Sequence, residues 1–170
     1  MKKIMVAAIT LDGKIAKHHL HNVDWTSKKD KAFFRKEVKK AGVVIFGANT
    51  YKAMGKAMPT VLNIVMTKSP KKYKNLETPN SLEFTNASPK KIVENLTQRK
   101  FKTVIIGGGA GIYTIFFKNK LIDEIHLTVV PKIFGKGVSL LNPLKISDLN
   151  LKLTSTSALG KGEVLLKYKV

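Results

Sequence analysis

The chain has 170 residues, of which 44% are apolar, and its 31 basic and 11 acidic side chains give a formal net charge of +20. This length and apolar content favour one domain over residues 1–170 with a full core, while the absence of cysteine and of any run of about 18 apolar residues excludes a disulfide framework, a thiolate metal site and a transmembrane helix. We therefore expect a cytoplasmic protein with no membrane partner, and the positive charge favours ligands that carry phosphate or carboxylate groups.

Strands and helices are predicted to alternate along about the first 130 residues. The continuous apolar run 4–9 indicates a strand buried on both faces, and the polar stretch 17–22 predicts a loop. Thr26 or Ser27 is the expected N-cap of the first helix, and Asp30 stands in its first turn, where an acid favours the helix dipole. Further strands are expected at 43–46, 62–66, 82–84, 103–106 and 123–130. The helices are expected at 28–40, 50–54, 89–99 and 111–118.

The C-terminal part of the chain predicts an antiparallel hairpin. Residues 149–157 and 163–170 alternate with a period of two, and Gly160-Lys161-Gly162 separates them. Residues 71–80 and 131–141 are expected to be loops. The fold class is therefore α/β, with a central, mostly parallel sheet, helices on both faces and a C-terminal antiparallel hairpin.

Three strand ends carry groups suited to phosphate. Ligands of open α/β sheets bind at the carboxyl ends of the strands, and glycine turns at helix N-termini offer bare N–H groups there, although such turns also occur where only a positive φ is needed. Two glycine turns and one hydroxyl–lysine–hydroxyl cluster in sheet order indicate a phosphorylated dinucleotide, NADPH in preference to NADH. The candidate cofactor residues are Gly47, Ala48, Asn49, Thr50, Thr67, Lys68, Ser69, Ile106, Gly107, Gly108, Gly109, Ala110, Gly111, Ile112 and Tyr113.

Asp30 is the candidate catalytic acid. Hydride transfer to a pterin or pyrimidine ring requires the protein to orient the rings and to place one acid beside the heterocycle. Asp30 stands in the first turn of a helix whose inner face carries Phe33 and Phe34; the alternative is a surface acid at the helix dipole. Glu37 lies among lysines and is expected to form a solvated ion pair, and Asp12 is expected to be a turn residue.

Several motifs agree jointly with one known family. They are Val6-Ala7-Ala8, the series Trp25, Asp30, Phe34 and Arg35, the turn Gly47-Ala48-Asn49-Thr50-Tyr51, Met58-Pro59, Asn63 to Thr67, Ile106-Gly107-Gly108-Gly109 with Tyr113, and Leu127-Thr128. Over nearly its whole length the chain resembles dihydrofolate reductase and its relative, the pyrimidine reductase of riboflavin synthesis.

This resemblance implies a dihydrofolate reductase-like three-layer fold and an NADPH-dependent reduction of dihydrofolate to tetrahydrofolate, with Asp30 assisting protonation. It also implies Ala8 and Ile15 as cofactor contacts. The substrate contacts that it implies are Val6, Ala7, Trp25, Phe34, Arg35, Met54 and Thr128.

The chain departs from dihydrofolate reductase at two positions. Ala48 stands where the family has an arginine that contacts the cofactor 2′-phosphate, and Lys68 is the expected replacement. Val61 stands where the family has the arginine that grips the folate carboxylate. Segments 11–16 and 123–137 look more like the pyrimidine reductase.

The alternative activity is therefore reduction of a ribosylamino-pyrimidine phosphate. A second alternative is a non-enzymatic, basic nucleotide- or nucleic-acid-binding protein. Specific nucleic-acid recognition is not expected, because only Arg35 and Arg99 of the 31 basic residues are arginines, the side chain that most often reads bases. We expect a monomer, as in the folate branch, or a homodimer, as in the pyrimidine branch, and a mobile lid over 17–23.

Overall fold

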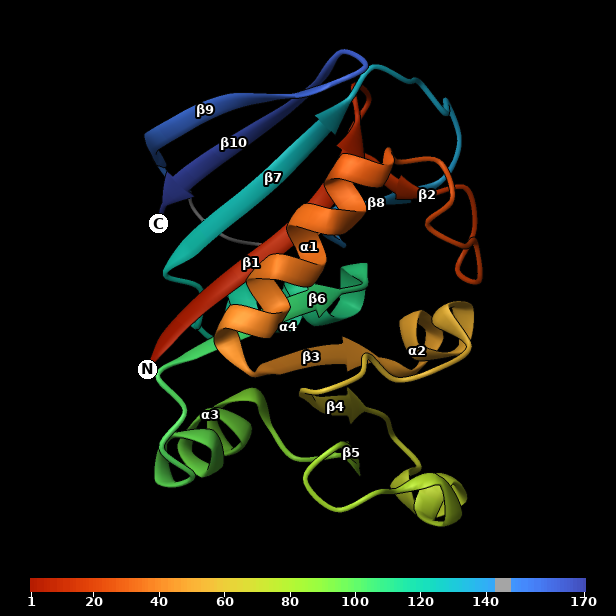
Figure 1. Cartoon of the computed structure of the whole chain (residues 1–170), viewed down its shortest axis with the longest axis vertical. Coiled ribbons are helices and arrows are strands. Elements are labelled where there is room, and N and C mark those ends of the chain that lie inside the picture. Colours follow the sequence, from red (N-terminus) through yellow and green to blue (C-terminus); the bar gives the residue numbers. More distant parts are fainter. Residues whose placement is uncertain (143–147) are drawn as a thin grey trace.

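One eight-stranded sheet runs through the computed structural model, which describes residues 1–142 and 148–170 (Figure 1). The strand order is β5-β4-β3-β6-β1-β7-β10-β9. All neighbours pair in parallel except β10, which is antiparallel to both β7 and β9. The strands are β1 (Lys2–Thr10), β3 (Val43–Gly47), β4 (Leu62–Met66), β5 (Leu82–Thr85), β6 (Thr103–Gly108), β7 (Glu124–Val130), β9 (Lys152–Gly160) and β10 (Glu163–Lys169).

Helices cover both faces of this sheet, so the predicted three-layer α/β fold is confirmed. Alternate residues of β1 point to opposite sides: Ile4 and Val6 join the core under α1, whereas Met5 and Ala7 join the core under α3 and α4. Figure 1 shows α1 crossing in front of β1 and β6, with α4 behind β6. The helices are α1 (Lys28–Ala41), α2 (Ala48–Met54), α3 (Pro89–Gln98) and α4 (Ala110–Lys118).

The start of α1 is fixed by a side-chain cap. Ser27, one of the two predicted candidates, is the N-cap, and its Oγ accepts a hydrogen bond of 3.1 Å from the backbone N–H of Asp30. The helix ends at Gly42, whose φ of 76° is left-handed. This cap places the Asp30 side chain in the first turn, at the end of α1 that lies beside the β9–β10 hairpin.

The C-terminal hairpin also forms as predicted. β9 and β10 are joined by the two-residue turn Lys161-Gly162, and both residues have positive φ, 55° and 77°. Positive φ at both turn positions matches the right-handed twist of the flanking strands.

Two segments differ from the expected loops. The short strands β2 (Lys14–Ala16) and β8 (Val138–Ser139) pair in a second, two-stranded sheet, although no strand was expected at 14–16 and a loop was expected at 131–141. The 3₁₀ helix η1 (Pro70–Leu76) occupies most of the predicted basic loop, because Tyr73 stacks on Phe84 of β5 with ring centroids 4.7 Å apart. Both elements depend on contacts that are distant in sequence, which local patterns do not show.

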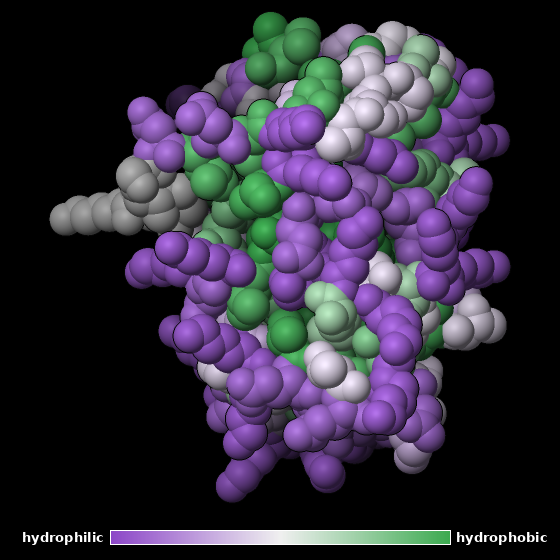
Figure 2. Space-filling view, turned by 90° about the vertical axis from the view of Figure 1, so that its left-hand side faces the viewer, coloured by the Kyte–Doolittle hydropathy of each residue, from purple (hydrophilic) through white to green (hydrophobic). Residues whose placement is uncertain are grey.

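The surface is dominated by charged side chains. Figure 2 shows one face of the molecule, on which hydrophilic residues surround a central strip of hydrophobic ones. Within the ranges 1–142 and 148–170, none of the helices combines the length and the apolarity that crossing a bilayer requires.

Candidate active site

A cleft of about 1160 Å³ opens at the carboxyl ends of the central parallel strands. Ala8 of β1, Gly47 of β3, Met66 of β4 and Gly107 of β6 all line it. This is the edge at which open α/β sheets bind ligands. Because single small-molecule pockets usually measure about 300–1000 Å³, the cleft is large enough for a dinucleotide together with a second ring.

The cleft brings together nearly all of the predicted site residues, which lie between Val6 and Tyr113 in the sequence. The exceptions are Ile106, Gly108 and Thr128, which do not line it. Ile106 is fully buried in the core, Gly108 lies beneath the ring of Tyr113, and Thr128 is buried beside Asp30. The predicted residues that line it are Val6, Ala7, Ala8, Ile15, Trp25, Asp30, Phe34, Arg35, Gly47, Ala48, Asn49, Thr50, Met54, Thr67, Lys68, Ser69, Gly107, Gly109, Ala110, Gly111, Ile112 and Tyr113.

The glycines at the start of α4 and just before it are present for two different physical reasons. A Cβ on Gly107 would lie 2.5 Å from Phe46 Cε1, and one on Gly108 would lie 2.8 Å from the Tyr113 hydroxyl oxygen, so the protein's own packing requires these two glycines. Gly111 is different, since a Cβ there would meet no heavy atom within 4 Å. Its open space faces the cleft, where a ligand can approach the backbone.

The N-terminus of α4 suits a phosphate group. Its N-cap is Gly109, which provides no side-chain hydrogen bond, so the first N–H groups of the helix are free to bind an anion. Lys68 and Lys72, near the end of β4, line the same cleft and add positive charge. These residues fit the phosphates of a dinucleotide such as NADPH.

Asp30 lies in the other part of the cleft and is only 7% exposed. Burial is the main cause that raises the pKa of Asp30, and the negative charge of Glu163 raises it further. The hydroxyls of Thr128 and Thr26 and the charge of Lys31 act in the opposite direction but do not prevail. The Thr26 contact lies outside normal hydrogen-bond geometry, since Oγ1 has no partner at normal length and angle. A carboxyl group with a raised pKa can donate a proton closer to neutral pH.

Tyr113 connects the two parts of the site. Its hydroxyl donates a 2.8 Å hydrogen bond to the carbonyl oxygen of Val6, and burial, followed by the charge of Asp30, raises its pKa. The hydroxyl therefore stays protonated and fixes α4 against β1, while the ring lines the cleft.

Four cationic side chains, of which only Arg35 was predicted, line the cleft on α1, α2 and the segment after α2. They are Lys31, Arg35, Lys52 and Lys56. Among residues 1–142 and 148–170, none of them forms an ion pair with an acidic side chain. The cations are therefore available to an anionic group of a ligand. The signal for Lys31 was its spacing one residue after Asp30 and one helical turn before Arg35.

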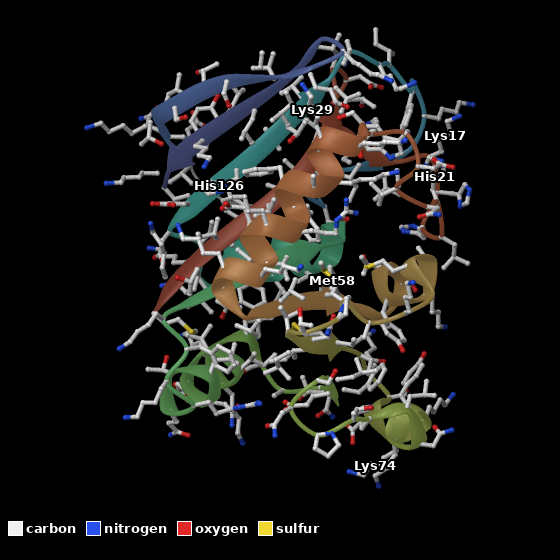
Figure 3. All side chains as sticks on the ribbon, in the orientation of Figure 1. Lys17, His21, Lys29, Met58, Lys74 and His126 are labelled. Atoms are coloured by element: carbon white, nitrogen blue, oxygen red, sulfur yellow. The ribbon has the colours of Figure 1, made fainter. Side chains whose placement is uncertain are left out.

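The loop before α1 lines the cleft and packs against Phe134. Trp25 packs edge-on against this ring with centroids 5.1 Å apart, His21 lies 6.0 Å from it, and the ammonium nitrogen of Lys17 lies 5.5 Å from its centroid. Figure 3 shows Lys17 and His21 on this loop. The residues of the loop that line the cleft are His19, His21, Asn22, Val23, Asp24 and Trp25.

Val61 and Glu37 both lie away from bulk solvent. Val61 is 6% exposed, packs in the core under α1 and does not line the cleft, so it offers no group to an anionic substrate. The prediction that Glu37 forms a solvated ion pair is wrong: its side chain is 14% exposed, and its carboxylate lies 3.0 Å from Nδ1 of the buried His126. Figure 3 shows His126 on β7, to the left of α1.

Comparison with known proteins places this geometry in context. The sequence profile described as RibD C-terminal domain matches residues 2–165. The uncharacterized protein YwjB of Bacillus subtilis is 28% identical, with 98% of this chain and 97% of that protein covered.

Two solved structures share the fold. A pyrimidine reductase-like protein from Corynebacterium diphtheriae superposes with a TM-score of 0.82 at 16% identity, covering 99% of this chain and 91% of the other. Dihydrofolate reductase from Enterococcus faecalis, solved with NADP(H), superposes with a TM-score of 0.71 at 17% identity, covering 99% and 95%. The predicted dihydrofolate reductase-like fold is confirmed, and the expected cofactor, NADPH, agrees with the NADP(H) bound to the Enterococcus protein.

Proposed function

Because the chain belongs to the RibD C-terminal domain family, we propose that it is an NADPH-dependent reductase of a phosphorylated, pyrimidine-type heterocycle rather than of dihydrofolate. The sequence favoured dihydrofolate as the substrate and gave the pyrimidine phosphate as the alternative, and the proposal reverses this preference. The family match over residues 2–165 supports the reversal, and so does Val61, which supplies no cation for a folate carboxylate.

The observation that carries the proposal is a group of cations that line the same cleft as Asp30. Lys31 and Arg35 stand one turn apart on α1, and Lys52 and Lys56 line the cleft from α2 and the segment after it. A phosphate carries more charge than a carboxylate and accepts several hydrogen bonds, so such a group of cations suits it well.

The residues around the glycine run would hold the cofactor. The N-terminal N–H groups of α4, the open space at Gly111, and Lys68 with Lys72 would bind its phosphates. NADPH, when bound, supplies the hydride. The apolar walls formed by Ala7, Phe34 and Met54 would orient the substrate ring and exclude water.

Asp30 would supply the proton. Hydride addition to a carbon–nitrogen double bond must be matched by a proton on the nitrogen, and Asp30 is the buried acid that lines the cleft. Burial and Glu163 raise its pKa, which increases the fraction of protonated acid near neutral pH.

The test is NADPH oxidation measured in parallel with a ribosylamino-pyrimidine phosphate, its dephosphorylated form and dihydrofolate. We expect turnover with the phosphate, and a KM at least about tenfold higher without it, the effect of losing one charge-assisted contact. Arg35→Ala should raise KM for the phosphorylated substrate alone, whereas Lys90→Ala, on α3 and outside the cleft, is the matched control.

Turnover of dihydrofolate alone would refute the pyrimidine assignment and establish the second candidate. That candidate is supported by the Trp25, Asp30 and Phe34 series in the cleft and by a putative dihydrofolate reductase of Caenorhabditis elegans, 29% identical over 82% of this chain and 78% of that protein. NADPH binding without oxidation of any substrate would instead favour the non-enzymatic nucleotide-binding alternative.

A further inference from the structure

Glu163 is a buried acid that the proposed reaction does not use. It is the first residue of β10, directly after the hairpin turn, and is 3% exposed. Its carboxylate accepts a 2.7 Å hydrogen bond from the backbone N–H of Ser27 and a second, short one from the Ser27 hydroxyl. Within the described part of the chain it forms no ion pair. A buried carboxylate without a cation is costly, so its position calls for an explanation.

Ser27 connects Glu163 to Asp30. Its hydroxyl donates to Glu163 and accepts from the backbone N–H of Asp30, at 3.1 Å. The hydrogen-bond chain therefore runs from β10 through the N-cap of α1 to the first helical turn, across 136 residues of sequence.

The hairpin turn packs closely on this end of α1. A Cβ on Gly160 would lie 3.2 Å from the Nζ of Lys29, and one on Gly162 would lie 3.1 Å from Pro131 Cγ. Figure 3 shows Lys29 on the first turn of α1, beside the hairpin. Gly160 thus allows the turn to approach α1, and Gly162 allows it to pack on Pro131 after β7, so Glu163 between these contacts is held in place.

Charged and polar groups from several elements act on Asp30. The charge of Glu163, on β10, raises the pKa of Asp30, in the same direction as burial, whereas Lys31 on α1 lowers it. The hydroxyls of Thr128 on β7 and of Thr26 also lower it. Tyr113 on α4 faces the same carboxyl group, and its own pKa is raised, so it adds no charge. Among the side chains that shift the pKa of Asp30, Glu163 is thus the acidic one.

We propose that Glu163 is a positioning residue for Asp30: it holds the first turn of α1 through Ser27, and it brings a negative charge to the Asp30 carboxyl group in a cleft that lysines line. The functional part of this proposal rests on the proposed reductase activity. The electrostatic part concerns the two acids alone and is measured without any substrate.

The first experiment titrates the carboxyl groups by NMR with carbon-13-labelled aspartate and glutamate. Removing the negative charge makes ionisation of Asp30 easier, so Glu163→Gln should move the Asp30 titration to lower pH. Glu94→Gln, an exposed substitution on α3 with the same charge change, should leave it unchanged. An unchanged Asp30 titration in folded Glu163→Gln would refute the proposal.

A conservative variant covers the case in which Glu163→Gln does not fold. Glu163→Asp keeps the negative charge at this position, so the Asp30 titration should stay close to that of the wild type. A folded Glu163→Asp protein whose Asp30 titration moves to higher pH or is lost would also refute the proposal.

The second experiment compares the pH profiles of kcat. The ratio of Glu163→Gln to wild-type kcat should lie near one in acid and fall with rising pH to a plateau about threefold or more below one, because the variant loses protonated Asp30 earlier. A purely structural defect lowers this ratio equally at every pH, and that result would refute the positioning role. Glu163→Asp, which keeps the charge, should restore the wild-type profile shape.

The two proposals fail in different ways. If the Asp30 titration moves in Glu163→Gln but no heterocycle oxidises NADPH, the coupling of the two acids stands and the proposed function fails. If NADPH oxidation proceeds with a titration that Glu163 does not influence, the reductase stands and the role of Glu163 is refuted.

Discussion

Gly111→Ala separates a ligand-binding role of the glycine run from a packing role. Gly111 is the second residue of α4, and a Cβ there meets no heavy atom of the protein within 4 Å. Replacing glycine by alanine inside a helix is favourable by about 0.5–1 kcal/mol. For a chain of this size that corresponds to a rise in Tm of roughly 1–4 °C. The folded protein should therefore tolerate the substitution or gain stability.

Binding should respond in the opposite direction. The added methyl group projects into the cleft beside the N-terminal N–H groups of α4, where we place a phosphate of NADPH. Keeping the phosphate away from those groups forfeits charge-assisted hydrogen bonds worth about 1.5–3 kcal/mol. The Kd for NADPH, measured by fluorescence titration, should rise roughly tenfold to 150-fold.

Gly107→Ala is the matched comparison. Its Cβ would lie 2.5 Å from Phe46 Cε1 and 3.0 Å from Val44 Cγ2, so we expect a loss of about 1–3 kcal/mol from overpacking and a lower Tm. Wild-type NADPH affinity in a stable Gly111→Ala protein would refute the placement of the phosphate at α4.

Three further predictions concern the acid, the loop and the core. Asp30→Asn should slow NADPH oxidation about 100-fold or more without changing NADPH affinity. The pKa of Asp30 is raised in the folded state, so its ionisation lowers the free energy of unfolding as the pH rises above the pKa that Asp30 has in the unfolded chain. The Asn variant should therefore be more stable than the wild type in urea at neutral pH. This difference should disappear in acid. Phe134→Ala removes the ring against which the loop over 17–25 packs and should speed hydrogen exchange there and raise KM severalfold; unchanged exchange would contradict the lid. Glu37→Ala removes the carboxylate 3.0 Å from Nδ1 of buried His126 and leaves only Glu124, 3.4 Å from Nε2, beside the ring; it should cost about 1 kcal/mol in urea denaturation, against nearly nothing for Glu94→Ala.

Much of the fold follows from local sequence patterns. Runs such as 4–9 and 103–106 are apolar because the central strands are covered on both faces. Ser27 and Gly42 mark the two ends of α1 through hydrogen bonds within a few residues. The glycine run also was recognised as important, but the sequence could not separate Gly107, required by Phe46, from Gly111, which faces open space. That distinction depends on side chains from other strands.

The elements that were missed depend on distant partners. β2 and β8 are three and two residues long and gain their hydrogen bonds from each other, with Lys14 opposite Ser139. Glu37 stands among lysines in the sequence, yet the helix turns it inward toward His126 on β7. Glu163 likewise meets Ser27 only through the folded hairpin. Patterns of neighbouring residues contain no information about such pairs.

The groups around Asp30 explain what a second acid contributes. The hydroxyls of Thr128 and Thr26 lower the pKa of Asp30, and the charge of Lys31, one of the cations that line the cleft, lowers it further. A proton donor in such a site requires opposing influences. Burial provides the larger one at Asp30, and Glu163 provides the other without exposing a carboxylate that would compete for the cations. In the proposed reductase, phosphate binding and proton donation would coexist in one cleft because the two acids are buried and the cations line its wall.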